Sequence, residues 1–125
     1  GNHMIQQGSG KIINICSIYS FLGGIGGIAY SATKHGIAGL TKTYCDELAK
    51  HNIQVNGIAP GYFKTALTEK TFSDPAKAQK IVERIPADRL GNPEDLMGAI
   101  VFLASPASNY VNGHILAVDG GYLVR

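Results

Sequence analysis

Three short apolar runs alternate with longer helical segments along this chain, and this alternation restricts the fold more than any other feature. The runs lie at residues 11–16, 54–59 and 114–118. The first is apolar almost throughout, as is typical of a parallel strand buried on both faces. Strands that alternate with helices are joined by crossovers. We therefore expect part of a doubly wound, Rossmann-like α/β domain, with three parallel strands and covering helices on both faces.

Hydrophobic spacing and capping residues predict three helices between these strands. The longest, at residues 29–50, repeats apolar side chains at helical spacing, and its expected buried stripe is Ile37, Leu40, Tyr44 and Leu48. Two more helices are expected where a capping side chain precedes a proline, at Asp74-Pro75 and Asn92-Pro93. The helix after Asn92 is expected to bury Leu96, Ile100, Val101 and Leu103.

Turn residues mark the ends of the second and third strands. Pro60-Gly61 stops the second strand, because proline cannot donate a ladder hydrogen bond. Asn112-Gly113 leads into the third strand and Asp119-Gly-Gly121 follows it, and these residue types tolerate positive φ. Three strands make a narrow sheet, and the first keeps an open edge unless another strand lies beside it. We therefore expect residues 1–125 to be a partial domain.

The composition favours a small-molecule ligand over other partners. Eleven basic and nine acidic residues give a formal net charge of +2 without a basic run, so nucleic acid is not the expected partner. No apolar stretch reaches the ~18 residues that span a bilayer, so no membrane partner is expected. Cys16 and Cys45 follow no secretory signal and are expected as reduced thiols of a cytoplasmic protein. The histidines lack metal-ligand spacing, so no metal site is predicted.

Tyr30 and Lys34 are the first candidate for chemistry. They lie four residues apart in the longest predicted helix, which places the phenol and the ammonium on one face. An unperturbed tyrosine has a pKa near ~10, and a cation within ~4 to 6 Å favours the phenolate. Such pairs are common on helix surfaces, but Ser17 lies at the carboxyl end of the first strand, where open parallel sheets bind ligands. Its hydroxyl can therefore face Tyr30.

Four segments resemble motifs of the short-chain dehydrogenase/reductase family, in order and at the family's spacing. They are Lys11-Ile-Ile-Asn-Ile-Cys-Ser17, Tyr30-Ser-Ala-Thr-Lys34, Asn56-Gly-Ile-Ala-Pro-Gly61 with Thr65, and Val118-Asp-Gly-Gly121. The resemblance covers essentially the whole chain and corresponds to the family's last three sheet strands. It implies that residues 1–125 are a dehydrogenase domain lacking its N-terminal, dinucleotide-binding half.

The resemblance implies a role for each of the three polar residues. Tyr30 is the expected general acid that protonates a carbonyl oxygen, or the base in the reverse direction. Lys34 is expected to favour the ionised phenol and to bind the nicotinamide ribose. Ser17 is expected to bind and polarise the substrate oxygen together with Tyr30. Ser20 is the competing hydroxyl, but its spacing to Tyr30 does not match the family's.

The same resemblance implies an NAD or NADP cofactor, and the sequence does not distinguish the two. The cofactor-binding residues are expected to be Tyr30, Lys34, Pro60, Gly61, Phe63 and Thr65. At Phe63 the main chain is the expected contact. The glycine-rich stretch at residues 23–27 does not replace the missing phosphate-binding fingerprint and is expected to let the loop approach the substrate. Residues 66–85 are the expected substrate lid.

Two further segments narrow the choice of substrate class. Residues 84–97 and 117–125 look like the corresponding parts of gluconate and deoxy-ketogluconate 5-dehydrogenases, which implies a sugar acid as the carbonyl or alcohol substrate. A 3-oxoacyl carrier-protein reductase is the alternative within the family, and a non-catalytic fragment or assembly module is the alternative outside it. The apolar end Tyr122-Leu-Val124 and the family pattern imply a homo-oligomer, a tetramer or a dimer.

Overall fold

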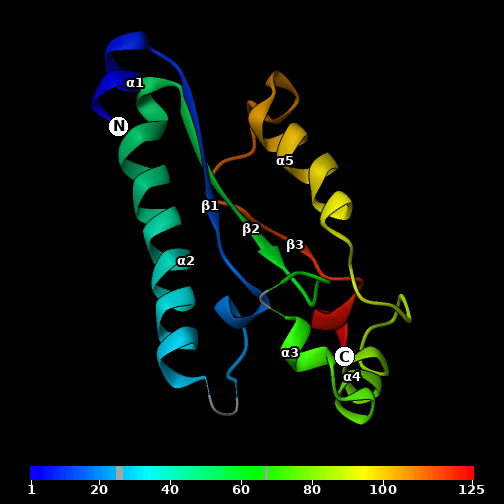
Figure 1. The fold of residues 1–125 in the computed structure, drawn as a ribbon. Coiled ribbons are helices and arrows are strands. Elements are labelled where there is room, and N and C mark those ends of the chain that lie inside the picture. Colours follow the sequence, from blue (N-terminus) through cyan, green and yellow to red (C-terminus); the bar gives the residue numbers. More distant parts are fainter. Residues whose placement is uncertain (25–26, 67) are drawn as a thin grey trace.

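A computed structural model of the chain describes residues 1–24, 27–66 and 68–125, and within them it has one parallel sheet. The strands β1 (Gly10–Ile15), β2 (Ile53–Pro60) and β3 (Ile115–Val118) lie in the order β1-β2-β3 (Figure 1). Ile15 pairs with Ile58, and Pro60 pairs with Val118. The carboxyl ends of all three strands therefore lie at one edge, and the predicted parallel α/β fold is confirmed.

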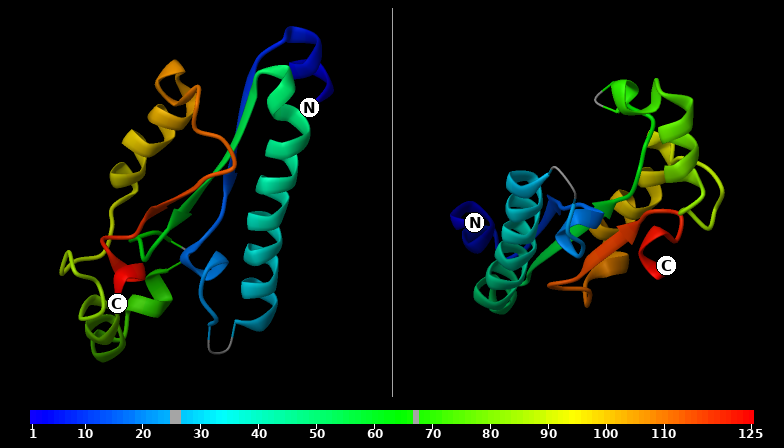
Figure 2. Two further views of the ribbon diagram at one scale, coloured as in Figure 1. Left: turned by 180° about the vertical axis from the view of Figure 1, so that it is seen from behind. Right: turned by 90° about the horizontal axis from the view of Figure 1, so that it is seen from below.

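Helices cover both faces of this sheet. Helix α2 (Ile28–Leu48) runs along one face and α5 (Met97–Ala104) along the other, as Figures 1 and 2 show. The other α-helices are α1 (Asn2–Gln7), α3 (Glu69–Phe72) and α4 (Pro75–Val82). The short 3-10 helices are η1 (Ile18–Ser20), η2 (Ala49–His51), η3 (Pro93–Leu96), η4 (Pro106–Ser108) and η5 (Tyr122–Val124). No helix of the described chain is long and apolar enough to cross a membrane.

The predicted helix start at Asp74 is confirmed. Its carboxylate accepts hydrogen bonds from the backbone N–H groups of Ala76 and Lys77, at 3.0 and 3.3 Å. These groups have no partner within a helix, so the cap stabilises the first turn of α4. The start predicted at Asn92 differs, because a turn of 3-10 helix comes before the α-helix.

The turn before β3 is held by the side chain of Asn112. Its amide oxygen accepts from the Val55 N–H at 2.7 Å, and its amide nitrogen donates to the Ile53 carbonyl at 3.2 Å. Gly113 has a φ of 71° and donates its own N–H to the Val55 carbonyl at 2.8 Å. The turn is therefore hydrogen-bonded to the start of β2.

The centre of the core is β2 rather than β1. Residues 53–59 of β2 are all buried, whereas β1 is half-buried, with Ile15 exposed at its end. The expectation that the first strand is buried on both faces was therefore wrong. In the described residues β1 pairs on one side only, with β2, so part of its surface stays open.

The buried stripes predicted for two helices were also wrong in part. In α2 the buried residues are Ala38 and Thr41, whereas Leu40 and Tyr44 are exposed. In α5 Leu103 is buried as predicted, but Ile100 and Val101 are exposed. Thr41 of α2 faces the sheet, because its hydroxyl accepts a hydrogen bond from the Asn14 side chain of β1 at 3.0 Å.

Candidate active site

Ser17 lies two residues after the end of β1 and caps η1. Its hydroxyl oxygen accepts a hydrogen bond from the Tyr19 N–H at 3.2 Å. A serine hydroxyl donates one proton and accepts through two lone pairs. Because the Tyr19 N–H uses a lone pair, and no acceptor in the described part of the chain takes the proton, Ser17 can donate to the oxygen of a ligand.

The hydroxyl of the nearby Ser20 forms hydrogen bonds within the protein. It accepts from the Ser17 N–H at 3.2 Å and donates to the backbone carbonyl of Lys34 at 2.8 Å. Ser20 is buried, and its proton is used within the protein. The competing serine therefore ties the loop after β1 to helix α2.

Lys34 joins the end of β1 to the first turns of α2. Its ammonium donates to the Ile15 carbonyl at 2.7 Å and lies 5.6 Å from the centroid of the Tyr30 ring. The predicted pair is therefore brought together, and the positive charge lies against the ring of Tyr30. An ammonium has three N–H donors, so two remain for a ligand.

Tyr30 lies in the first turn of α2 and is 50% exposed. Its ring contacts that of Tyr19, with centroids 5.9 Å apart and planes at 81°. The Tyr19 hydroxyl is 2.8 Å from the hydroxyl of Tyr62, which lies in the loop after β2. Neither Tyr19 nor Tyr62 was predicted. Their places just after two adjacent strands were the signal that could have found them, because parallel strands end at one edge.

The loop after β2 starts with a close backbone approach. Pro60 is the last paired residue of β2, opposite Val118. A Cβ built on Gly61 would lie 2.7 Å from the Cα of Asp119. Only glycine fits at this position without movement, so the turn after β3 fixes the direction in which the loop leaves the sheet.

Phe63 and Thr65 present different groups along this loop. Phe63 is 7% exposed, and its ring packs against Gly91. Thr68 donates its hydroxyl proton to the Phe63 carbonyl at 2.6 Å and lies 3.2 Å from the Thr65 hydroxyl. Thr65 is therefore the donor in that pair and keeps a lone pair for an N–H group of a ligand.

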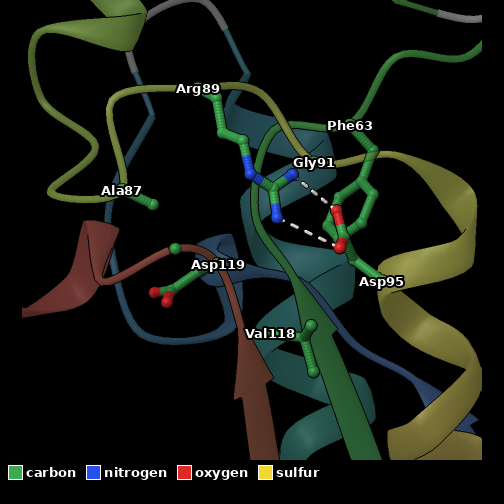
Figure 3. Close-up of a pocket in the computed structure, with 8 residues that line it drawn as sticks. Phe63, Ala87, Arg89, Gly91, Asp95, Val118 and Asp119 are labelled. Atoms are coloured by element: carbon green, nitrogen blue, oxygen red, sulfur yellow. Dashed lines mark hydrogen bonds and ion pairs between the residues drawn. The ribbon is translucent and has the colours of Figure 1, made fainter.

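Two cavities lie beside this loop. One of about 270 Å³ contains Phe63 and the ion pair of Arg89 with Asp95, whose two hydrogen bonds measure 2.7 and 3.1 Å (Figure 3). Hydrogen bonds from Arg89 and from the Asn92 N–H lower the pKa of Asp95 to about 2. The guanidinium of Arg89 and the carboxylate of Asp95 satisfy each other, whereas the Asp119 carboxylate of the same cavity accepts hydrogen bonds from the N–H groups of Gly121 and Leu123.

The larger cavity, of about 840 Å³, lies between the loop and helices α3 and α4. Lys64, Thr65 and Phe72 are among its lining residues. Ser17, Tyr30 and Lys34 line neither cavity. Of these three residues, Ser17 is buried, Lys34 is half-buried and Tyr30 is 50% exposed.

Other predictions about reactive groups concern cysteine, metal and glycine. Cys16 and Cys45 are free thiols, as expected, and burial raises the pKa of Cys16, although its interactions with Thr41 and Ser20 and the charge of Lys34 oppose this shift. No cluster of three or more metal-ligating side chains occurs in residues 1–24, 27–66 and 68–125. Of the glycine-rich stretch 23–27, residues 25 and 26 lie outside the described residues.

Known proteins match this chain along nearly its whole length. A family model described as enoyl-(acyl carrier protein) reductase matches residues 1–123. The uncharacterised oxidoreductase YgcW of Escherichia coli is 67% identical over 122 residues, which are 98% of this chain and 47% of that protein. The 2-dehydro-3-deoxy-D-gluconate 5-dehydrogenase of Bacillus subtilis is 57% identical over 125 residues, which are 100% of this chain and 49% of that enzyme.

A solved structure agrees with these sequence matches. The crystal structure of a gluconate 5-dehydrogenase from Burkholderia cenocepacia in complex with NADP and tartrate has a TM-score of 0.97 and 47% identity, covering 99% of this chain and 49% of that one. The chain spans about half the length of the relatives it matches. From the family model, these identities and the shared fold, it follows that the chain belongs to the short-chain dehydrogenase/reductase family.

Proposed function

We propose that this chain is the C-terminal half of an NAD(P)-dependent oxidoreductase that interconverts a secondary alcohol and a ketone on a sugar acid. Tyr30 gives or takes the proton in this proposal. The observation that carries it is the Lys34 ammonium, which the Ile15 carbonyl holds at 2.7 Å and which lies 5.6 Å from the Tyr30 ring. A tyrosine on an open strand-end edge, beside a fixed cation, is suited to proton transfer.

The described side chains account for the proton in ketone reduction. Ser17 donates its free proton to the carbonyl oxygen and polarises the C=O bond. Tyr30 then transfers its phenolic proton to the same oxygen, and the positive charge of Lys34 stabilises the phenolate that remains. In the reverse direction the phenolate of Tyr30 takes the proton of the alcohol.

The loop after β2 and helix α2 fit the nicotinamide end of a dinucleotide. The two remaining N–H groups of Lys34 suit ribose hydroxyls, and the Thr65 hydroxyl oxygen suits the N–H of a carboxamide. Pro60, Gly61 and the main chain of Phe63 form the wall between these two points. When bound, the reduced cofactor, NADH or NADPH, would supply the hydride for ketone reduction, and the oxidised form would accept it in the reverse direction. The Burkholderia cenocepacia relative is a complex with NADP, which supports this class of cofactor.

A sugar acid is the proposed substrate class. The Bacillus subtilis relative is named for 2-dehydro-3-deoxy-D-gluconate and the Burkholderia cenocepacia relative for gluconate. The latter complex also contains tartrate, a hydroxylated dicarboxylate. In this chain Lys64 lines the larger cavity beside Thr65 and provides a positive charge for a carboxylate. Residues 66–85, which include α3 and α4, form the proposed lid over this cavity.

Replacing Tyr30 tests the proton donor. In the full-length protein, Tyr30→Phe removes the hydroxyl and keeps the ring, so turnover should fall by about 10²-fold or more while the Kd for NADPH or NADH stays the same. Tyr44→Phe is the matched control, because Tyr44 is an exposed tyrosine of the same helix, and its turnover should not change. Unchanged turnover in Tyr30→Phe would exclude this residue as the donor.

Two measurements distinguish the proposal from its alternatives: the intact mass of the protein and the substrates that it reduces. An intact mass near twice the 13.2 kDa of these residues would support the half-domain proposal. That protein should reduce 5-ketogluconate and not a β-ketoacyl thioester, whereas the reverse would favour a 3-oxoacyl carrier-protein reductase. A mass of 13.2 kDa without saturable binding of NADH or NADPH would favour a non-catalytic module.

A further inference from the structure

We propose that Tyr19 is a positioning residue for Tyr30, and that its hydrogen bond to Tyr62 holds it in place, a role that rests on the proposed function. Tyr30 is half exposed, so the core does not fix the direction of its hydroxyl. The contacts of its ring come from Lys34 on its own helix and from Tyr19 in η1, the 3-10 helix after β1.

The main chain of Tyr19 is anchored on both sides. Its neighbours Ile18 and Ser20 are buried. The Tyr19 N–H donates to the Ser17 hydroxyl at 3.2 Å, and the Ser20 hydroxyl donates to the Lys34 carbonyl at 2.8 Å. Tyr19 therefore belongs to a turn that is bonded both to the proposed substrate-binding serine and to the helix that carries Tyr30.

The Tyr19 ring lies against both Tyr30 and Gly24. The ring centroids of Tyr19 and Tyr30 are 5.9 Å apart, and their planes meet at 81°, a favourable edge-to-face arrangement. A Cβ built on Gly24 would lie 2.5 Å from the Cε1 atom of Tyr19. The absence of a side chain at Gly24 therefore leaves the space that the Tyr19 ring occupies.

The Tyr19 hydroxyl is fixed by Tyr62 at 2.8 Å. Tyr62 is held in turn by the rings of Tyr122 and Phe72, at centroid distances of 5.3 and 6.4 Å. Burial raises the pKa of Tyr62, so this phenol stays neutral and keeps its proton for hydrogen bonding. Because Phe72 ends α3, the orientation of Tyr30 is linked to the first helix of the proposed lid.

The test uses phenylalanine variants of the full-length protein. Tyr19→Phe and Tyr62→Phe each delete the same hydrogen bond and keep both rings, so each should lower kcat about 5-fold without changing the KM for the cofactor. The double variant should lose no more than either single variant, because only one bond is removed. Tyr19→Leu removes the ring as well and should lower kcat about 50-fold.

Two further variants define the role of the ring. Gly24→Ala should displace the Tyr19 ring and lower kcat as Tyr19→Leu does, although residue 19 itself is unchanged. Tyr110→Phe is the control, because Tyr110 is fully exposed, and it should have the kcat of the unsubstituted protein. In Tyr19→Leu the pH at which kcat for alcohol oxidation is half-maximal should also move, because the surroundings of the proposed base change.

Several results would overturn the positioning role. One is a lower melting temperature with unchanged kcat per folded molecule in Tyr19→Leu, because that is the effect of a purely structural residue. Additive losses in the double phenylalanine variant would also exclude the shared hydrogen bond. No turnover in the unsubstituted protein would overturn the proposed function itself, and the positioning role with it.

Discussion

At the scale of single residues, the candidate site depends on which protons and lone pairs the fold already uses. Ser17 accepts from a backbone N–H and keeps its proton, whereas Ser20 donates its proton to the Lys34 carbonyl. Thr65 keeps a lone pair because Thr68 gives its proton to Phe63. Hydroxyls that look alike in the sequence therefore offer different groups to a ligand.

Gly61 leads to a prediction about stability. A Cβ there would lie 2.7 Å from the Cα and 2.8 Å from the Cβ of Asp119, and backbone atoms cannot move aside as a flexible side chain can. Gly61→Ala should therefore lower the free energy of unfolding by about 1–3 kcal/mol in urea denaturation. Gly98→Ala is the control, because Gly98 lies in α5 and a Cβ there meets nothing within 4 Å. That variant should be neutral or more stable by up to ~1 kcal/mol, so equal losses in the two variants would contradict the argument.

The candidate residues of the site could be chosen from the sequence more readily than their contacts could. Ser17, Tyr30 and Lys34 became candidates because the family motif sets their spacing, and the structure places Lys34 beside Tyr30. Tyr19 and Tyr62 were not identifiable, because they come from two loops that are 43 positions apart and meet only when β1 and β2 pair. Spacing along one helix can be read from a sequence, whereas a contact between two strand-end loops requires the register of the sheet.

At the scale of secondary structure, the turn before α5 is held by a charged pair. Arg89 donates two hydrogen bonds to Asp95, and the same carboxylate accepts from the Asn92 N–H at 2.8 Å. The pair therefore links Arg89 to η3, the 3-10 helix that contains Asp95. The Asp95 carboxylate thus folds back onto the Asn92 backbone and forms a capping box at the start of the 3-10 turn.

This pair predicts a pH-dependent contribution to stability. The pKa of Asp95 is lowered to about 2 in the folded chain, against ~3.9 for an unfolded aspartate. A carboxylate with a lowered folded pKa stabilises the fold above the unfolded pKa, and this stabilisation is lost as the pH falls toward the folded value. Asp95→Asn should therefore be less stable than the unsubstituted protein at pH 7, and the gap in urea denaturation should close between about pH 4 and pH 2.

Glu94→Gln is the control for that titration. Glu94 is the adjacent carboxylate and has no ion pair or hydrogen bond through its side chain among the described residues. Its difference from the unsubstituted protein should stay small at every pH. A gap for Asp95→Asn that is the same at pH 7 and at low pH would show that the ionised pair does not stabilise the turn.

The ends of helices and strands were predicted more reliably than their buried faces. Asp74-Pro75 and Asn112-Gly113 form a cap and a turn as expected, because both depend on local geometry. Leu40, Tyr44 and Val101 are exposed, against the prediction. An apolar side chain on a helix can face the core or a surface that packs against another part of a larger protein, and hydrophobic spacing does not distinguish these two cases.

At the scale of the whole molecule, helices cover the faces of the sheet, and its two edge strands are unpaired on their outer sides. In the described residues β2 has a strand on each side, whereas β1 and β3 each pair only with β2. The apolar C-terminal residues, which were expected at a subunit contact, differ in exposure. Tyr122 is buried against the lid segment, whereas Val124 is 79% exposed. Exposed apolar side chains on α5 fit the proposed homo-oligomer, a tetramer or a dimer.

The open edge predicts how residues 1–125 behave alone. An unpaired strand edge is a template for association, so this chain should form concentration-dependent oligomers or aggregates in sedimentation velocity experiments. A chimera in which the N-terminal half of the Escherichia coli relative precedes residue 1 should give a single defined species and bind NADPH or NADH saturably. A stable monomer of residues 1–125 would contradict the incomplete-sheet interpretation.

The hydrogen bonds of the Asn112-Gly113 turn affect how the protein ages chemically. Asparagine followed by glycine loses ammonia when the glycine nitrogen attacks the side-chain amide and closes a succinimide ring. Here the Gly113 N–H is bonded to the Val55 carbonyl, and the Asn112 amide is bonded to Ile53 and Val55. Ring closure requires these bonds to break first, so deamidation proceeds from molecules whose turn has opened. The amount of isoaspartate that accumulates at this position in a stored sample therefore measures how often the turn before β3 opens.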